Sequence, residues 1–142
     1  MNALVICGLN GHIYYVSIGY GRNSDLLLFS RTGLPSFLSA NKLKVLGDRG
    51  FKNPHVLFPI DPEETDVEMQ FNNVMYEYRS VVENIYGRVS NWKVASSKFK
   101  QDLSLHTHSL HIIYQIEAMK IQESPPRNLD LSKTSRKTNF SY

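Results

Sequence analysis

The stretch ALVICGLNGHIYYVSIG, residues 3–19, decides how this chain begins to fold. Residues 3–8 are apolar throughout and predict a buried strand, and residues 12–19, rich in β-branched and aromatic side chains, predict its neighbour. Asn10-Gly11 between them indicates a hairpin turn, because both residue types tolerate positive φ. The chain is therefore expected to begin inside a sheet. A domain that starts with so apolar a strand leads us to expect further sequence upstream.

Short elements are predicted after this hairpin. Ser24 or Asn23 can cap a helix over residues 25–30, and Gly33-Leu-Pro35 is expected to end that helix. Three more pieces follow: a short turn over residues 36–41, a third strand over residues 43–46 that closes at Gly47-Asp48, and an extended piece over residues 55–59.

The strongest periodic signal lies over residues 67–89, where apolar side chains recur at steps of three and four, as one face of a helix requires. We expect this face to pack on the sheet. A second helical pattern covers residues 110–121, and Ser124-Pro125-Pro126 ends it. The resulting division is a domain over residues 1–122 and a polar tail over 123–142 that is expected to be disordered. The periodic face consists of Phe71, Val74, Met75, Tyr78, Val82, Ile85 and Val89.

Composition narrows the functional classes only a little. The formal net charge of +3 favours an anionic partner weakly. Cys7 is the one cysteine, which excludes an internal disulfide and a cysteine-based zinc site, and we expect it to be a buried strand residue. No apolar run approaches the roughly 20 residues of a membrane-spanning helix. The N-terminus shows no signal-peptide pattern.

Two carboxylates stand out by their surroundings. Asp48 follows the third predicted strand in a Gly-Asp-Arg-Gly turn, and Glu83 lies on the long predicted helix, 35 positions later. A carboxylate at a strand end and another on a later helix can share a metal ion. Two plainer interpretations stay open. Asp48 can be an ordinary turn residue, and Glu83 can simply pair with Arg79 at i, i+4.

Four short motifs, in this order, resemble those of the DDE nucleases related to Harbinger transposases. They fall within residues 3–121 and leave only the tail outside. The family pattern has His where this chain has Ser24, and Phe where it has Tyr86. The four motifs are Gly21-Arg-Asn-Ser-Asp25, Leu46-Gly-Asp-Arg-Gly-Phe51, Phe71-Asn72 and Arg79-x-x-x-Glu83-x-x-x-Gly87.

The resemblance implies an α/β, RNase H-like fold, of which this chain is the C-terminal portion. In that family three carboxylates hold two divalent ions, Mg²⁺ or Mn²⁺, for cleavage or strand transfer on DNA. Asp48 and Glu83 correspond to the second and third, with Arg79 and Asp25 as possible supporting residues. The first carboxylate and its core strand have no counterpart here, since Asn10 occupies a turn and cannot replace them.

Two functions are therefore expected as alternatives. One is a metal-dependent nuclease domain of transposase ancestry, truncated and inactive alone, in the nucleus by family resemblance, with DNA as its partner. The other is a non-catalytic remnant that binds nucleic acid or protein. No helix-turn-helix is visible, so DNA recognition would need another region or another protein. The chain has two other candidate clusters, neither more than a weak signal: His106, His108 and His111 for zinc, and Lys93, Lys98 and Lys100 with Trp92 and Phe99 for a nucleic-acid backbone.

Overall fold

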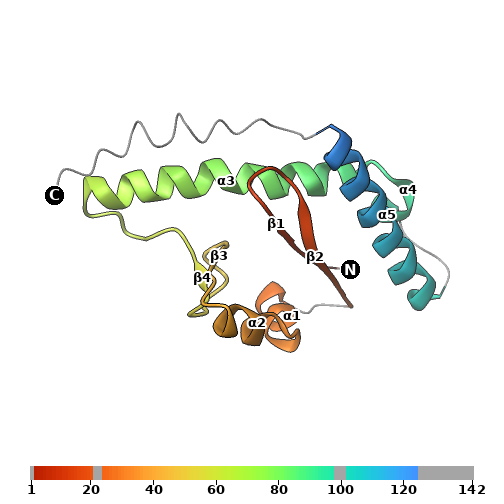
Figure 1. Ribbon diagram of the computed structural model, residues 1–142, viewed down its shortest axis with the longest axis horizontal. Coiled ribbons are helices and arrows are strands. Elements are labelled where there is room, and N and C mark those ends of the chain that lie inside the picture. Colours follow the sequence, from red (N-terminus) through yellow and green to blue (C-terminus); the bar gives the residue numbers. More distant parts are fainter. Residues whose placement is uncertain (1, 21–23, 98–101, 125–142) are drawn as a thin grey trace.

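The computed structural model describes residues 2–20, 24–97 and 102–124 of the chain. It has the mixed helix and strand content expected of an α/β protein (Figure 1). In chain order the elements are β1 (Asn2–Cys7), β2 (Ile13–Gly19), α1 (Asp25–Arg31), α2 (Leu34–Ala40), β3 (Val45–Leu46), β4 (Val56–Leu57), α3 (Asp66–Ser90), α4 (Lys93–Ser96) and α5 (Leu103–Glu123).

The N-terminal hairpin is confirmed. β1 and β2 pair antiparallel, in a register that runs from Asn2 opposite Gly19 to Cys7 opposite Ile13. The connecting turn uses the predicted pair of residues. Gly11 has a φ of 81°, which lies in the region that favours glycine. The Asn10 side chain accepts a hydrogen bond of 3.0 Å from the His12 N–H.

The third strand is shorter than predicted and lies in a different sheet. Only Val45 and Leu46 are extended, and they pair in parallel with Val56 and Leu57 of β4. Within the described part of the chain, β1–β2 and β3–β4 form two separate two-stranded sheets. The prediction over residues 43–46 failed at its start because Leu43 N–H bonds to the Leu38 carbonyl at the end of α2.

The short helices partly follow prediction. Ser24 caps α1, and its side chain accepts a hydrogen bond from the Leu27 N–H; the alternative cap, Asn23, lies outside the described residues. Pro35, which was expected only to end this helix, stands in the first turn of α2. Proline suits that position, because the first N–H groups of a helix have no partner within it.

The long helix α3 confirms the prediction over residues 67–89. It begins with a capping box, in which the Thr65 side chain accepts from the Glu68 N–H and Glu68 accepts from the Thr65 N–H. Hydrogen bonds from the Glu64 N–H and from Thr65 lower the pKa of Glu68. The buried face is rotated from the predicted one. Its buried residues are Asn72, Met75, Val81, Ile85 and Val89, whereas Phe71, Val74, Tyr78 and Val82 are half-buried.

Helix α5 begins at Leu103, earlier than the predicted residue 110. The first turns escaped prediction because Leu103 and Leu105 are exposed there and give no buried stripe. Further along, Met119 was assigned to the apolar face but is 65% exposed, while Glu117 is buried. The predicted end at Ser124 is confirmed, and residues 125–142 of the polar tail lie outside the described part. Among the described helices, none has the length and apolar content to cross a membrane.

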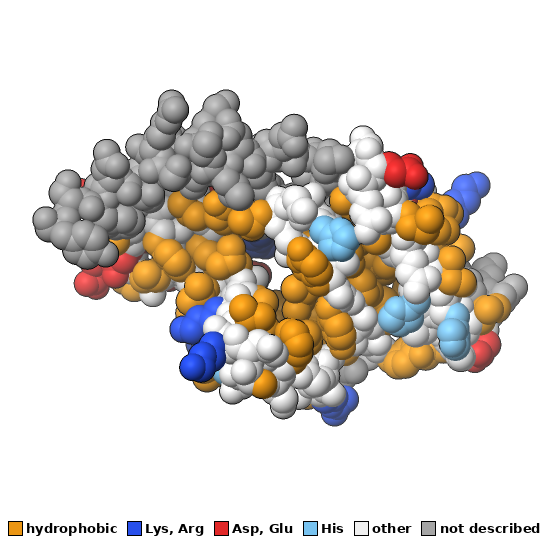
Figure 2. Space-filling model, viewed as in Figure 1, with side chains coloured by type: hydrophobic (Ala, Val, Ile, Leu, Met, Phe, Trp, Pro, Cys, Tyr) orange, Lys and Arg blue, Asp and Glu red, His pale blue; other side chains and the backbone are white. Residues whose placement is uncertain are grey.

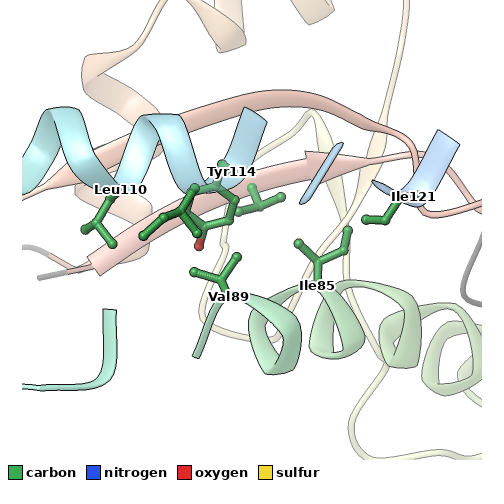
Figure 3. Close-up of a cluster of buried hydrophobic side chains, with 7 residues drawn as sticks. Ile85, Val89, Leu110, Tyr114 and Ile121 are labelled. Carbon is green, nitrogen blue, oxygen red and sulfur yellow. The ribbon is translucent and has the colours of Figure 1, made fainter. Parts of the chain in front are cut away.

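The hairpin stands between two hydrophobic clusters. Val5 of β1 joins one cluster, which α3 and α5 complete with Ile85, Val89, Leu110, Ile113, Tyr114 and Ile121 (Figure 3). Leu4, the preceding residue, joins the other, with Leu28, Phe29, Leu34, Leu38 and Val56. Neighbouring side chains of a strand point to opposite faces, so β1 is covered on both. This explains why residues 3–8 are apolar throughout rather than alternating.

Candidate active-site groove

A single groove collects the sequence-predicted acidic residues. Its volume is about 490 Å³, and β1, the segment around β3, α1 and the middle of α3 line it. Figure 2 shows the surface hollowed where Figure 1 places a gap between α3, the hairpin and the β3–β4 pair. Among the lining residues are the four predicted site residues: Asp25, Asp48, Arg79 and Glu83.

Asp48 is held in the turn that follows β3. Its carboxylate accepts a hydrogen bond of 2.7 Å from the Arg49 N–H, and its carbonyl accepts one of 2.9 Å from the Phe51 N–H. Gly47 is required before it, because a Cβ there would lie 2.5 Å from the Val56 side chain. Arg49 also pairs with Asp61, which ties the turn to the loop before α3. The turn interpretation of Asp48 is thus correct as local structure, and the turn brings the side chain to the groove.

Arg79 joins the two carboxylates. Its Nη1 lies 3.3 Å from Asp48 Oδ1, and its Nε lies 3.2 Å from Glu83 Oε1. The i, i+4 pair expected from sequence therefore exists, and the same guanidinium reaches the other element. All three side chains are about half exposed, so each pair contributes roughly 0–1 kcal/mol to stability. The arrangement places one positive charge between two carboxylates from separate parts of the chain.

The donor chemistry of this pair suits a hard divalent cation. Mg²⁺ and Mn²⁺ prefer oxygen ligands, and Mg²⁺ keeps several waters, so few protein ligands are needed. Within the described residues, however, no three His, Cys, Asp or Glu side chains lie together as a metal-binding group. The groove thus offers a two-carboxylate site in which Arg79 already offsets one of the two negative charges.

Two further groove residues connect the surrounding elements. Asp25 is the first residue of α1 and lines the groove near Tyr86 of α3. The Tyr86 hydroxyl donates a hydrogen bond of 2.9 Å to the Ala3 carbonyl. Burial, and then the Asp25 charge, raise the pKa of Tyr86 to about 12, so this hydroxyl stays protonated at neutral pH. In the sequence analysis Tyr86 was noted only because it stands where the family pattern has Phe. In the structure its hydroxyl connects α3 to β1 through this hydrogen bond.

The sequence analysis assigned no role to Asn72, which is fully buried in α3. Its side chain donates to the Ile60 carbonyl at 2.8 Å and to Glu63 at 2.6 Å, and it accepts from the Ile60 N–H at 2.8 Å. These bonds fix the loop that leads from β4 into α3. Asn72 belongs to the Phe-Asn motif. Its place in the sequence, on a helix face that is otherwise apolar, was the signal that could have identified this role.

Glu117 is the second functional group that sequence reasoning missed. This α5 residue is 4% exposed and accepts hydrogen bonds of 2.9 Å from Trp92 Nε1 and from Lys120 Nζ. Arg88 lies 3.9 Å away, and the Lys120 ammonium stands 4.9 Å from the centre of the Trp92 ring. The network connects α3, the start of α4 and α5. These contacts give Trp92 a structural role.

The Glu117 network makes the stability of the chain depend on pH. Burial opposes ionisation of Glu117, but the hydrogen bonds from Lys120 and Trp92 outweigh it and lower the pKa. A lowered pKa stabilises the folded state above the unfolded-state pKa, and this contribution is lost as pH falls through the folded-state pKa. We expect Glu117→Gln to reduce the free energy of unfolding at pH 7 by roughly 1–3 kcal/mol.

The measurement is urea unfolding of both proteins across pH 3–7. The difference between them is expected to shrink as the pH falls below about 4.3, the ordinary pKa of Glu. A difference that stays constant down to pH 3 would contradict the assignment. Glu123→Gln, an exposed position on the same helix, serves as the control and is expected to show no such trend.

The remaining candidate residues lie elsewhere. A ring nitrogen of His106 lies 2.9 Å from the Val94 carbonyl, and one of His108 lies 2.7 Å from the Ser104 carbonyl. Lys93 is exposed on α4, while Lys98, Phe99 and Lys100 lie outside the described residues. Cys7 was expected to be buried and is half-buried in β1; burial raises the pKa of its thiol to about 11, which keeps it protonated.

Comparison with known families gives one finding. The family described as DDE superfamily endonuclease matches residues 1–119, which include all of β1–α4 and most of α5. Comparison with curated proteins and with solved structures gives no match. The matched segment contains the groove and all four of its predicted site residues, Asp25, Asp48, Arg79 and Glu83. Because the match covers most of the 142 residues, this chain belongs to the DDE superfamily endonuclease family.

Proposed function

We propose that this chain is part of a divalent-metal-dependent nuclease domain derived from a DDE transposase of the Harbinger type, and that Asp48 and Glu83 are two of its metal ligands. One observation carries the proposal. These carboxylates lie 35 positions apart in sequence and on separate elements, yet both line one groove and both contact Arg79. The family membership supplies the class of substrate, a nucleic acid, for which DNA is the proposed member.

The proposed mechanism divides the work between ions and side chains. Bound divalent ions would activate the attacking water or 3′-hydroxyl and stabilise the leaving oxygen. Asp48 would hold an ion from the turn after β3, and Glu83 would hold one from α3. Arg79 lies between them, and its guanidinium would hold the two carboxylates in place and contact the phosphate. Asp25, at the start of α1, lines the same groove and would orient the site rather than ligate.

We further propose that the fold is RNase H-like and incomplete, with its first core strand and first carboxylate supplied from outside this chain. Support comes from the two small sheets, which flank the groove without a strand between them in the described residues. DNA recognition would be the task of an upstream region or a separate DNA-binding protein. A nuclear location is proposed on the same family ground.

Metal binding at the pair is directly testable. Arg79→Gln removes the positive charge that competes with a cation, so Mn²⁺ should bind about thirtyfold more tightly, since unit charges about 4 Å apart interact by roughly 1 kcal/mol in water and Mn²⁺ carries two. Adding Asp48→Asn should reverse the gain. The measurement is the free Mn²⁺ signal in electron paramagnetic resonance during a titration.

Arg31→Gln is the matched control, because it removes the same charge from an exposed helix position. Equal tightening in this control would show that only net charge matters, and unchanged affinity in Arg79→Gln would remove Asp48 and Glu83 from the metal site.

The chain alone is expected not to cleave DNA at a useful rate with Mg²⁺ or Mn²⁺. Two carboxylates that already share the Arg79 charge would hold ions loosely and misplace the attacking water, and a displacement of about 1 Å can cost 10²-fold. A plasmid-nicking assay with purified protein measures this. Robust nicking that EDTA abolishes and Glu83→Ala removes would show that the site is complete as it stands.

The contact of both carboxylates with Arg79 also supports the alternative function, a non-catalytic, transposase-derived module that binds nucleic acid or protein. Arg79 satisfies both carboxylates without a metal, as a retired active site would permit. The Mn²⁺ titration separates the two proposals, because a binding module has no reason to take up the ion at Asp48.

A further inference from the structure

Basic side chains gather on the segment that runs from the end of α2 to β4, here called the α2–β4 corner. Between residues 26 and 60 the one carboxylate is Asp48, which belongs to the groove. Figure 2 shows Lys and Arg side chains at the place where Figure 1 draws α2 and β4. The corner therefore presents an excess of positive charge to solvent. Its exposed basic residues are Lys42, Lys44, Arg49 and Lys52.

The pairing of β3 with β4 holds these residues beside the groove. Lys44 directly precedes β3 and His55 directly precedes β4, and the Val45 N–H donates a hydrogen bond of 3.0 Å to the His55 carbonyl. Because the two strands are parallel, both residues lie at the same end of the ladder. Lys52 stands just before the turn that leads into β4. The corner is thus a short, hydrogen-bonded unit rather than a run of unrelated surface residues.

Most of this positive charge has no counter-charge nearby. Arg49 pairs with Asp61, but Lys42, Lys44 and Lys52 form no ion pair with a carboxylate of the described residues. Lys44 lines the groove, as Arg79 does, whereas Lys42 and Lys52 do not. Positive charge therefore extends out of the groove and onto the surface of the corner.

The segment that leads into α3 carries the opposite charge. Figure 2 shows acidic side chains at the end of the molecule where Figure 1 places the start of α3. A polyanion would be repelled there and attracted at the α2–β4 corner, so the charges select one side from which it can reach the groove. The exposed acidic residues of this segment are Asp61, Glu63, Glu64 and Asp66.

We propose that Lys42, Lys44 and Lys52 bind the phosphate backbone of a DNA duplex and place it at the groove from the side of the α2–β4 corner. The inference rests on the proposed function for the identity of the polyanion, since the family supplies a nucleic acid as substrate. Lysine contacts phosphate as a point charge and reads no base. Binding at the corner is therefore independent of DNA sequence, strongly dependent on salt and independent of divalent metal.

Lys42 offers a test that separates charge from structure. It follows the end of α2 with a φ of 53°, a conformation in which glycine and asparagine are the usual residues. Backbone bonds close this turn, from the Lys42 N–H to the Ser39 carbonyl at 3.2 Å and from the Leu43 N–H to the Leu38 carbonyl at 2.9 Å. Lys42→Asn should therefore leave the midpoint of urea unfolding unchanged or raise it, while the positive charge is lost.

The experiment is a titration of the full chain into a fluorescein-labelled duplex of about 20 base pairs and arbitrary sequence. Fluorescence anisotropy is measured in EDTA at several salt concentrations. Each phosphate contact contributes about 0.9 to the slope of log K against log salt. Lys42→Asn and Lys52→Gln should each make the slope shallower by about 0.9, and together they should weaken binding at least about tenfold at roughly 50 mM salt.

Two variants serve as controls. Lys93→Gln removes the same charge from an exposed position on α4, at the other end of α3 from the corner (Figure 1), and should leave the slope unchanged. Lys42→Arg keeps the charge and should keep the slope of the unmodified chain. Lys44 is left in place because it also lines the groove.

Three results would overturn the proposal: an unchanged slope in both Lys42→Asn and Lys52→Gln, an equal change in Lys93→Gln, or no salt-dependent binding by the unmodified chain. Polyglutamate that competes as well as unlabelled duplex at equal charge would assign the corner to acidic polypeptides and overturn the partner named here. Because EDTA removes divalent ions, the Mn²⁺ titration can fail while these slope changes hold, and the reverse, so the failures of the two proposals are distinguishable.

Discussion

Replacing Asp48 or Glu83 with Ala is expected to reduce metal-dependent DNA cleavage by at least about 10²-fold in a protein that contains this chain together with the proposed first carboxylate. Loss of even an outer-shell partner of a metal costs about 10–100-fold, and a direct ligand should cost more. The two side chains approach the groove from different elements, so neither can replace the other. The measurement is the rate of supercoiled plasmid nicking in Mg²⁺ and in Mn²⁺.

Glu77→Ala is the control for this pair. Glu77 is an exposed carboxylate on the same helix, less than two turns before Glu83, and it does not line the groove. It should leave the rate unchanged. Retained cleavage in either groove variant, or an equal loss in Glu77→Ala, would refute the assignment of Asp48 and Glu83 as ligands.

The second large effect concerns stability. Ile85 is 0% exposed, at the centre of the cluster that joins α3, β1 and α5 (Figure 3). Ile85→Ala is expected to lower the free energy of unfolding by about 3 kcal/mol, within the roughly 2–5 kcal/mol range of such truncations. A domain is typically stable by only about 5–15 kcal/mol, so this loss is a large fraction. Urea unfolding followed by circular dichroism measures it.

Asn84→Ala provides the comparison, because Asn84 is the exposed neighbour of Ile85 on the same helix. Its effect should stay within about 0.5 kcal/mol, as surface substitutions usually do. If Ile85→Ala cost less than about 1 kcal/mol, the contact between α3 and α5 would not be the packing described above.

Much of the fold was predictable because its signals are local. The Asn10-Gly11 turn, the capping residue Ser24 and the three- and four-residue period of α3 each depend on residues close together in sequence. The first turns of α5 were missed because Leu103 and Leu105 point to solvent. Asn72 was left out of the predicted α3 face because it is polar, and hydrophobic periodicity counts such a residue as exposed.

The site was predictable only as a set of candidates. Motif contexts identified Asp48 and Glu83, and the i, i+4 spacing predicted that Arg79 would contact Glu83. No rule of spacing connects Arg79 to Asp48 across 31 positions, because that contact depends on where the turn after β3 meets α3. The Glu117 network could not be predicted for the same reason. Its partner Arg88 lies on α3 and its partner Trp92 lies directly before α4, both far from Glu117 in sequence.

The sequence by itself determined the elements: the hairpin, the long helix, the turn that carries Asp48 and the family to which they belong. It could do so because turn chemistry, capping and amphipathic period act within a few residues. Only the tertiary structure decided that β3 pairs with β4 instead of the hairpin, that Arg79 bridges both carboxylates, and that residues of β1, β3 and α3 line one groove. These features depend on long-range packing, which covers β1 on both faces and places α3 against it.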